Sequence, residues 1–191
     1  MIKKLKNQKG FSLAETLLAV LILLLVSVIV ANGVPAAQSA YEKVVLGANA
    51  KVLLSTTISA LRDELATATK VKVATDNKTI TYYSADKGAV SEIYIEPSGM
   101  PVIKLKEYSS VNPTDFTGNT AIYDGMENVR NLVSGQAATG DLYVTYDSID
   151  NYTAGDDSIT IKGLKVARQS NPAAELATAD LTIRFIIPAE E

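Results

Sequence analysis

The sequence contains no cysteine and no histidine among its 191 residues. Without cysteine an exported domain has no disulfides, so its stability must come from packing and backbone hydrogen bonds. Ser-His-Asp and Cys-His catalytic arrangements are excluded, as are zinc sites built on these two residue types. Glycine-rich phosphate-binding loops and evident pairs of catalytic acids are also missing. We therefore predict neither an enzyme nor a cofactor.

Acidic residues are absent from the first ten positions, which contain Lys3, Lys4, Lys6 and Lys9. A basic leader of this kind stays on the cytoplasmic side of a membrane. The whole chain has 18 basic and 21 acidic residues, and removal of the four leader lysines leaves 14 against 21, a formal charge of −7. Nucleic-acid binding is led by basic contacts to phosphate, so this balance disfavours direct binding to DNA or RNA.

A long apolar run follows the leader. Between Thr16 and Val34 the only sizeable polar side chains are Ser27 and Asn32. A helix needs about 20 such residues to cross the hydrocarbon layer, so this run predicts one membrane helix. An ordinary secretory signal cut after Gly33 or Ser39, or a plain signal anchor, would also begin with a basic head. Neither alternative explains the acid at the start of the run.

That acid is Glu15. A carboxylate costs about 2.5–3.5 kcal/mol at mid-membrane on insertion scales and less near the interface, so intramembrane acids are candidate functional residues. Pairing with a cation in a low-dielectric bundle would remove the uncompensated charge. The alternative is an acid that reaches the membrane interface and has no partner.

The residues Lys-Gly-Phe-Ser-Leu-Ala-Glu at 9–15, followed by the apolar run, resemble the class III signal of type IV prepilins and pseudopilins. The resemblance implies that a peptidase cuts between Gly10 and Phe11 and methylates the new amine of Phe11. It also implies that Glu15 faces the N-terminal amine of a neighbouring subunit. The helix would sit first in the cytoplasmic membrane and then in the core of an extracellular filament.

The same resemblance implies several partners: other pilin subunits, a prepilin peptidase with methylase activity, a membrane platform protein and a cytoplasmic assembly ATPase. The lack of cysteine departs from the disulfide of many Gram-negative pilins and fits Gram-positive pilins or pseudopilins better. A pilus subunit is the main hypothesis. A pseudopilin of a type II secretion or competence DNA-uptake system is the alternative, and a tethered extracellular domain that does not polymerise is a further one.

An α+β fold is predicted, with a long N-terminal helix packed on an antiparallel sheet. Its expected parts are a leader at 1–10, a membrane or filament-core helix at 11–35, an amphipathic helix at 36–70 and a β head at 71–191. Gly33 and Pro35 predict a helix break, either a kink or a boundary with a new helix starting at Pro35. The amphipathic face is predicted from apolar residues mostly three or four positions apart: Val44, Val45, Ala48, Val52, Leu54, Ile58, Leu61 and Leu65.

Alternating β-branched and aromatic residues predict six strands in the head. They are expected at 79–84, 92–96, 102–106, 141–146, 158–162 and 181–187. The polar connection at 108–140 is expected to be a surface loop, with one short strand at 121–123.

Asp147, Asp150, Asp156 and Asp157 are clustered within eleven residues. Oxygen-rich loops can bind calcium, and major pseudopilins have such a site in a C-terminal loop. The spacing here does not match an EF-hand, so a solvated turn between strands is the competing interpretation. These residues are weak calcium candidates, and no metal is predicted.

Overall fold

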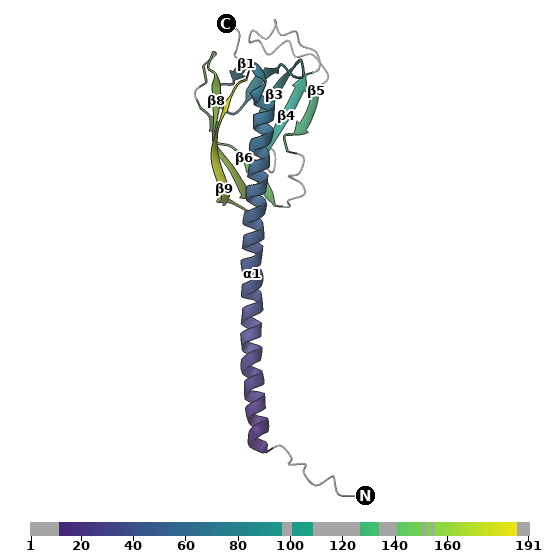
Figure 1. Cartoon of the computed structure of the whole chain (residues 1–191), viewed down its shortest axis with the longest axis vertical. Coiled ribbons are helices and arrows are strands. Elements are labelled where there is room, and N and C mark those ends of the chain that lie inside the picture. Colours follow the sequence, from purple (N-terminus) through teal and green to yellow (C-terminus); the bar gives the residue numbers. More distant parts are fainter. Residues whose placement is uncertain are drawn as a thin grey trace. The chain divides into compact units, whose positions relative to one another are not determined.

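The computed structural model describes residues 12–96, 101–108, 127–133, 141–150, 152–153 and 155–186. The chain divides into two compact units, Met1–Leu46 and Gly47–Glu191. One helix, α1 (Leu13–Ala66), begins in the first unit and ends in the second (Figure 1).

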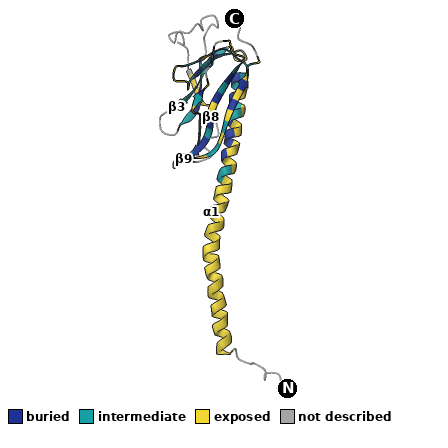
Figure 2. Ribbon diagram, turned by 90° about the vertical axis from the view of Figure 1, so that its left-hand side faces the viewer, coloured by how far each residue is buried: buried dark blue, intermediate teal, exposed yellow. Residues whose placement is uncertain are grey.

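In the first unit, α1 is exposed along nearly its whole length. Every described side chain from Ser12 to Val45 is exposed to solvent (Figure 2). The helix continues through Gly33 and Pro35, so the helix boundary considered at these residues is wrong. Proline removes only one backbone donor, and its fixed φ is close to that of a helix, so the neighbouring hydrogen bonds can maintain the turn. A looser turn in an assembled state stays a prediction.

In the second unit, one face of α1 is buried. It consists of Ala50, Leu53, Leu54, Thr57, Leu61 and Leu65. The buried hydroxyl of Thr57 donates a hydrogen bond to the carbonyl of Leu53, 2.8 Å away, so its polar group is satisfied. The helix ends at Ala66, a few residues before the expected end of the amphipathic segment.

The buried face was predicted only in part. Leu61 is fully buried, whereas Val52 is 65% exposed. These residues are nine positions apart, or two and a half turns, and therefore point in opposite directions. Apolar residues lie on both of these sides of the helix. The sequence pattern did not show which of the two sides would be buried. Four residues assigned to the buried face are exposed instead: Val44, Val45, Ala48 and Val52.

The first sheet is a five-stranded antiparallel meander in which every strand pairs with the next one along the chain. Its strands are β1 (Ala68–Val73), β2 (Ile80–Ser84), β3 (Ala89–Glu96), β4 (Val102–Tyr108) and β5 (Glu127–Asn131). The expected strands at 79–84, 92–96 and 102–106 are confirmed as β2, β3 and β4. Residues 68–70, expected to be helical, belong to β1, and the expected strand at 121–123 lies outside the described residues.

The second sheet is built around β8 (Ser158–Arg168). β6 (Leu142–Thr145) and β7 (Ser148–Ile149) pair with β8, and β9 (Asn171–Arg184) forms a long antiparallel hairpin with it. The expected strands at 141–146 and 158–162 are confirmed as β6 and the first part of β8. The strand expected at 181–187 is confirmed as far as Arg184, where β9 ends, and Ile187 lies outside the described residues. Leu181 and Ile183 of β9 are buried, as the predicted alternation requires.

Distant segments satisfy the carbonyls at the end of α1. The amide of Ile186, just after β9, donates to the carbonyl of Ala66 at 2.7 Å. The amide of Ala85, after β2, donates to the carbonyl of Thr67 at 3.2 Å. The last carbonyls of a helix lack partners within the helix, so these bonds stabilise its end. The predicted α+β fold, a long N-terminal helix packed on antiparallel sheets, is confirmed.

Candidate functional site

The N-terminal half of α1 is an exposed apolar surface of membrane length. The helix contains a window with mean hydropathy 2.9 that is not buried and is long and apolar enough to cross a membrane. Between Leu13 and Val34, fourteen large hydrophobic side chains are exposed. Each is worth about 1.5–3 kcal/mol on full burial, so leaving this surface in water would cost on the order of tens of kcal/mol. Burial of this surface in a bilayer or against neighbouring apolar helices would therefore be strongly favourable.

The start of α1 is a capping box formed by Ser12 and Glu15. The amide of Ser12 donates to Oε2 of Glu15 at 2.9 Å, and the amide of Glu15 donates to Oγ of Ser12 at 3.3 Å. Two of the backbone donors that a helix start leaves unpaired are thus satisfied reciprocally. The capping box was not predicted from the sequence, although Ser-x-x-Glu before an apolar run is a signature of this cap.

The structure says less about the other processing and helix-break candidates of the N-terminal segment. Gly10 and Phe11 lie outside the described residues. Gly33 and Pro35 are exposed residues inside α1. Glu15 is thus the one processing or assembly candidate whose contacts are described, and its carboxylate lies at the first turn of the helix.

Each of the four weak calcium candidates has a partner within the described part of the chain. Three of them form ion pairs: Asp147 with Lys165 at 2.8 Å, Asp150 with Lys162 at 2.8 Å, and Asp157 with Arg184 at 3.5 Å.

The fourth, Asp156, accepts a hydrogen bond from the amide of Thr153 at 2.7 Å. Asp150, Asp156 and Asp157 line one polar hollow of about 200 Å³. Even so, no group of three acidic side chains suited to a metal ion is found in the described part of the chain. The calcium interpretation therefore stays a weak prediction.

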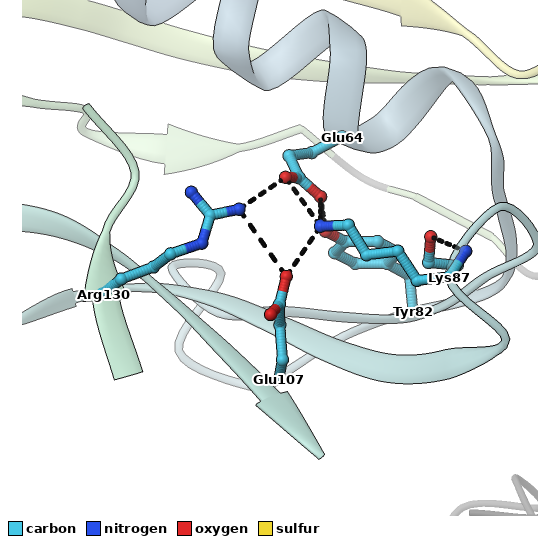
Figure 3. A network of polar contacts seen from close by, with 6 residues as sticks. Glu64, Tyr82, Lys87, Glu107 and Arg130 are labelled. Carbon is cyan, nitrogen blue, oxygen red and sulfur yellow. Dashed lines mark hydrogen bonds and ion pairs between the residues drawn. The ribbon is translucent and has the colours of Figure 1, made fainter. Parts of the chain in front are cut away.

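A polar cluster joins the end of α1 to the first sheet (Figure 3). We call Glu64, Tyr82, Lys87, Glu107 and Arg130 the polar clamp. Nζ of Lys87 lies 2.7 Å from Oε2 of Glu64 and 2.7 Å from Oε1 of Glu107. Arg130 reaches the same two carboxylates at 3.0 and 3.6 Å, and the hydroxyl of Tyr82 donates to Glu64 at 3.1 Å.

The polar clamp brings two acids together, as an active site would, but its charges are balanced. Partial burial alone would lower the pKa of Lys87, yet its hydrogen bonds to Glu107 and Glu64 raise that pKa above the usual value. The hydrogen bond from Lys87 and the charge of Arg130 lower the pKa of Glu107. Burial and the Glu64 carboxylate raise the pKa of Tyr82. None of these three groups titrates near neutral pH, so they are unsuited to general acid–base chemistry there.

Residues 5–31 match the family model described as Prokaryotic N-terminal methylation motif. The matched segment contains the second half of the basic leader, the Gly10-Phe11 junction, Glu15 and most of the apolar run. This motif is the class III signal of type IV prepilins and pseudopilins, and over these residues the chain is similar to them. No curated protein and no solved structure matches the chain significantly.

Proposed function

We propose that this protein is a structural subunit of a type IV pilus or a related filament and polymerises through its N-terminal helix. The observation that carries the proposal is the exposed, membrane-length α1 with a single acid in its first turn. The methylation motif over residues 5–31, which includes this acid and most of the apolar run, also supports it. The protein performs no catalytic turnover and needs no cofactor.

Processing comes first in this proposal. The leader at 1–10 stays cytoplasmic while the helix crosses the membrane once. A prepilin peptidase with methylase activity then cuts between Gly10 and Phe11 and methylates the amine of Phe11. A platform protein and an assembly ATPase move the subunit into an extracellular filament, where neighbouring helices replace lipid around the apolar surface.

Glu15 is the proposed docking group. In the filament its carboxylate pairs with the N-terminal amine of Phe11 of a neighbouring subunit. The surrounding helices exclude water, so the attraction between opposite charges is far stronger than in solution. A charge left buried alone would cost about 3–5 kcal/mol, so subunits whose acid lacks its partner are disfavoured.

The test compares Glu15→Gln and Glu15→Asp with wild type, by immunoblotting membrane and sheared-filament fractions of a strain whose other pilins are intact. Glutamine preserves size and eases membrane insertion, so a simple membrane anchor would tolerate it. We expect normal membrane levels of Glu15→Gln but little in filaments, with Glu15→Asp intermediate because its side chain is shorter. Incorporation of Glu15→Gln at the wild-type level would refute the docking role.

A separate experiment tests processing. The mass of the mature N-terminus should correspond to a chain that begins with N-methylated Phe11. Replacing Gly10 by a bulky residue should leave the leader attached and abolish filaments. A mature end after Gly33 or Ser39 would instead indicate ordinary secretion.

A pseudopilin of a type II secretion or competence DNA-uptake system is the second candidate. The absence of cysteine favours it, or a Gram-positive pilus, over a disulfide-containing Gram-negative pilin. All these systems share the processing and docking steps above. A tethered extracellular domain that never polymerises would instead be absent from the sheared-filament fraction, in wild type as in the variants.

A further inference from the structure

A second apolar stripe runs along α1 on the side opposite the buried face. Its members, which we call the outer stripe, are Tyr41, Val44, Val45, Ala48 and Val52, and all five side chains are exposed. Tyr41 and Val44 are 71% exposed and Val52 is 65% exposed. Since the sheets cover the other side of the helix, this apolar surface has no cover within the described part of the chain.

The outer stripe lies beyond the reach of a bilayer. If the apolar run from Thr16 to Val34 spans the hydrocarbon layer, Tyr41 lies about 10 Å beyond that layer and Val52 about 27 Å beyond it, at 1.5 Å per residue. The headgroup region on one side of a bilayer is only about 5–8 Å thick. A contiguous apolar patch that remains in water is typical of a protein interaction site. The stripe therefore fits a protein partner and not lipid.

The spacing of the outer stripe is that of a two-stranded coiled coil. Tyr41, Val45, Ala48 and Val52 are separated by four, three and four positions, which is the interval of a heptad seam. The two valines occupy a positions, where β-branched residues favour two parallel strands, and Tyr41 and Ala48 occupy d positions. The next d and a positions are serines, so the seam ends after Val52.

We propose that two copies of the unassembled subunit pair in the membrane through their outer stripes, in parallel and in register. Because the same apolar run anchors both copies, their stripes lie at the same height above the bilayer. Confinement to one membrane also raises the effective concentration of one stripe for the other, as a linker does, so a short seam can suffice. The pairing does not depend on polymerisation.

The surroundings of the outer stripe permit this pairing. Leu61 belongs to the buried face and lies nine positions from Val52, so the sheets are on the far side of the helix from a second copy. The flanking positions bring no like charges together. In a parallel pair Lys51 of one helix would face Thr56 of the other, which is uncharged.

The experiment uses disulfide cross-linking, because the chain has no cysteine of its own. Single-cysteine variants of the full chain are expressed in a bacterial host without pilus-assembly proteins, and the membranes are treated with copper phenanthroline. A disulfide requires Cβ atoms about 4 Å apart. Ala48→Cys, at a d position of the seam, should therefore give a band at twice the chain mass of 20.3 kDa.

Lys43→Cys is the matched control. Lys43 is also exposed and lies at a similar height, but it is about 200° around the helix axis from Val45. We expect a band for Ala48→Cys that is severalfold stronger than the band for Lys43→Cys at equal membrane levels. Adding Val45→Asp to Ala48→Cys should remove this band, whereas adding Val45→Ile should preserve it.

Three results would overturn the proposed pairing. Equal bands for Ala48→Cys and Lys43→Cys would indicate random collisions in the membrane, and no band for Ala48→Cys would show that the stripes do not meet. A third variant, Tyr41→Cys, tests the register when it is expressed together with Ala48→Cys. Cross-links between these two positions, without any between two copies of Ala48→Cys, would show a neighbour displaced along the helix axis. The filament role, tested through Glu15, is decided separately from all of these results.

Discussion

Replacing Glu64 by glutamine should weaken the polar clamp measurably. The Glu64 side chain is 13% exposed and bonds to Tyr82, Lys87 and Arg130. Glutamine keeps the shape and one accepting oxygen, but it loses the negative charge on which the two cations depend. The remaining carboxylate, on Glu107, is left to balance both of them.

The magnitude follows from the exposure of the partners. Removing one member of a fully buried ion pair costs about 3–5 kcal/mol, whereas exposed pairs contribute about 0–1 kcal/mol. The side chains of Lys87 and Arg130 are 32% and 44% exposed, so solvent screens part of the interaction. We therefore expect Glu64→Gln to lower the free energy of unfolding by about 1–3 kcal/mol, between those two limits.

The assay is denaturant unfolding of a protein that lacks residues 1–35, which removes most of the apolar helix surface. Glu96→Gln is the control, because Glu96 also pairs with a lysine of the first sheet, Lys104 at 2.8 Å, but is 37% exposed. The control should change the free energy of unfolding by less than about 0.5 kcal/mol. An equally small effect of Glu64→Gln would show that the polar clamp does not stabilise the fold.

Three further predictions concern the same unit and use the same assay. Leu61→Ala should cost about 2–5 kcal/mol because Leu61 is fully buried, whereas the exposed Val52 should tolerate alanine within about 0.5 kcal/mol. Equal costs would show that the buried face of α1 is misassigned. Gly88→Ala should lower the free energy of unfolding by about 1 kcal/mol, because the backbone at Gly88 is left-handed, with φ +61°. Gly163→Ala should lower it more. The backbone at Gly163 is also left-handed, with φ +63°, and the new methyl group would in addition meet the Asp147 side chain. A Gly163→Ala protein as stable as Gly88→Ala would contradict this. The contribution of Glu107 to the polar clamp, measured as wild type minus Glu107→Gln, should be constant near neutral pH, because the pKa of Glu107 is lowered and that of Lys87 is raised. It should decrease as pH falls below the usual glutamate value of 4.5 and again as pH rises above the usual lysine value of 10.5. A decrease centred near pH 7 would point to a different group.

Much of the fold could be predicted from local patterns. The alternation in β2, β3 and β9 reflects strands with one buried face, which any sheet of this kind requires. β5 is different, because Glu127–Asn131 is polar and shows no such alternation. It is a strand because its backbone completes the ladder next to β4, with Lys104 opposite Asn131. Tertiary hydrogen bonding decided that structure, not local preference.

The candidate site divides in the same way. The contact between Ser12 and Glu15 spans three residues and could be read from the sequence as a capping box. The contact between Glu64 and Arg130 spans 66 residues and depends on how β5 pairs with β4. No periodicity relates two residues so far apart. The choice between the two apolar stripes of α1 likewise depended on which side the sheets would occupy.

The hydrogen bonds at the end of α1 have a mechanical consequence. If the filament is pulled, load transmitted along α1 enters the β sheets at Ala66 and Thr67. The backbone there is bonded to Ile186, near the end of the described chain, and to Ala85, after β2. A force that pulls on the helix is therefore shared between the two sheets at Ala66 and Thr67. The strand that follows the helix along the chain, β1, does not carry the whole force. The sheets should consequently resist being peeled away one strand at a time, without any covalent cross-link.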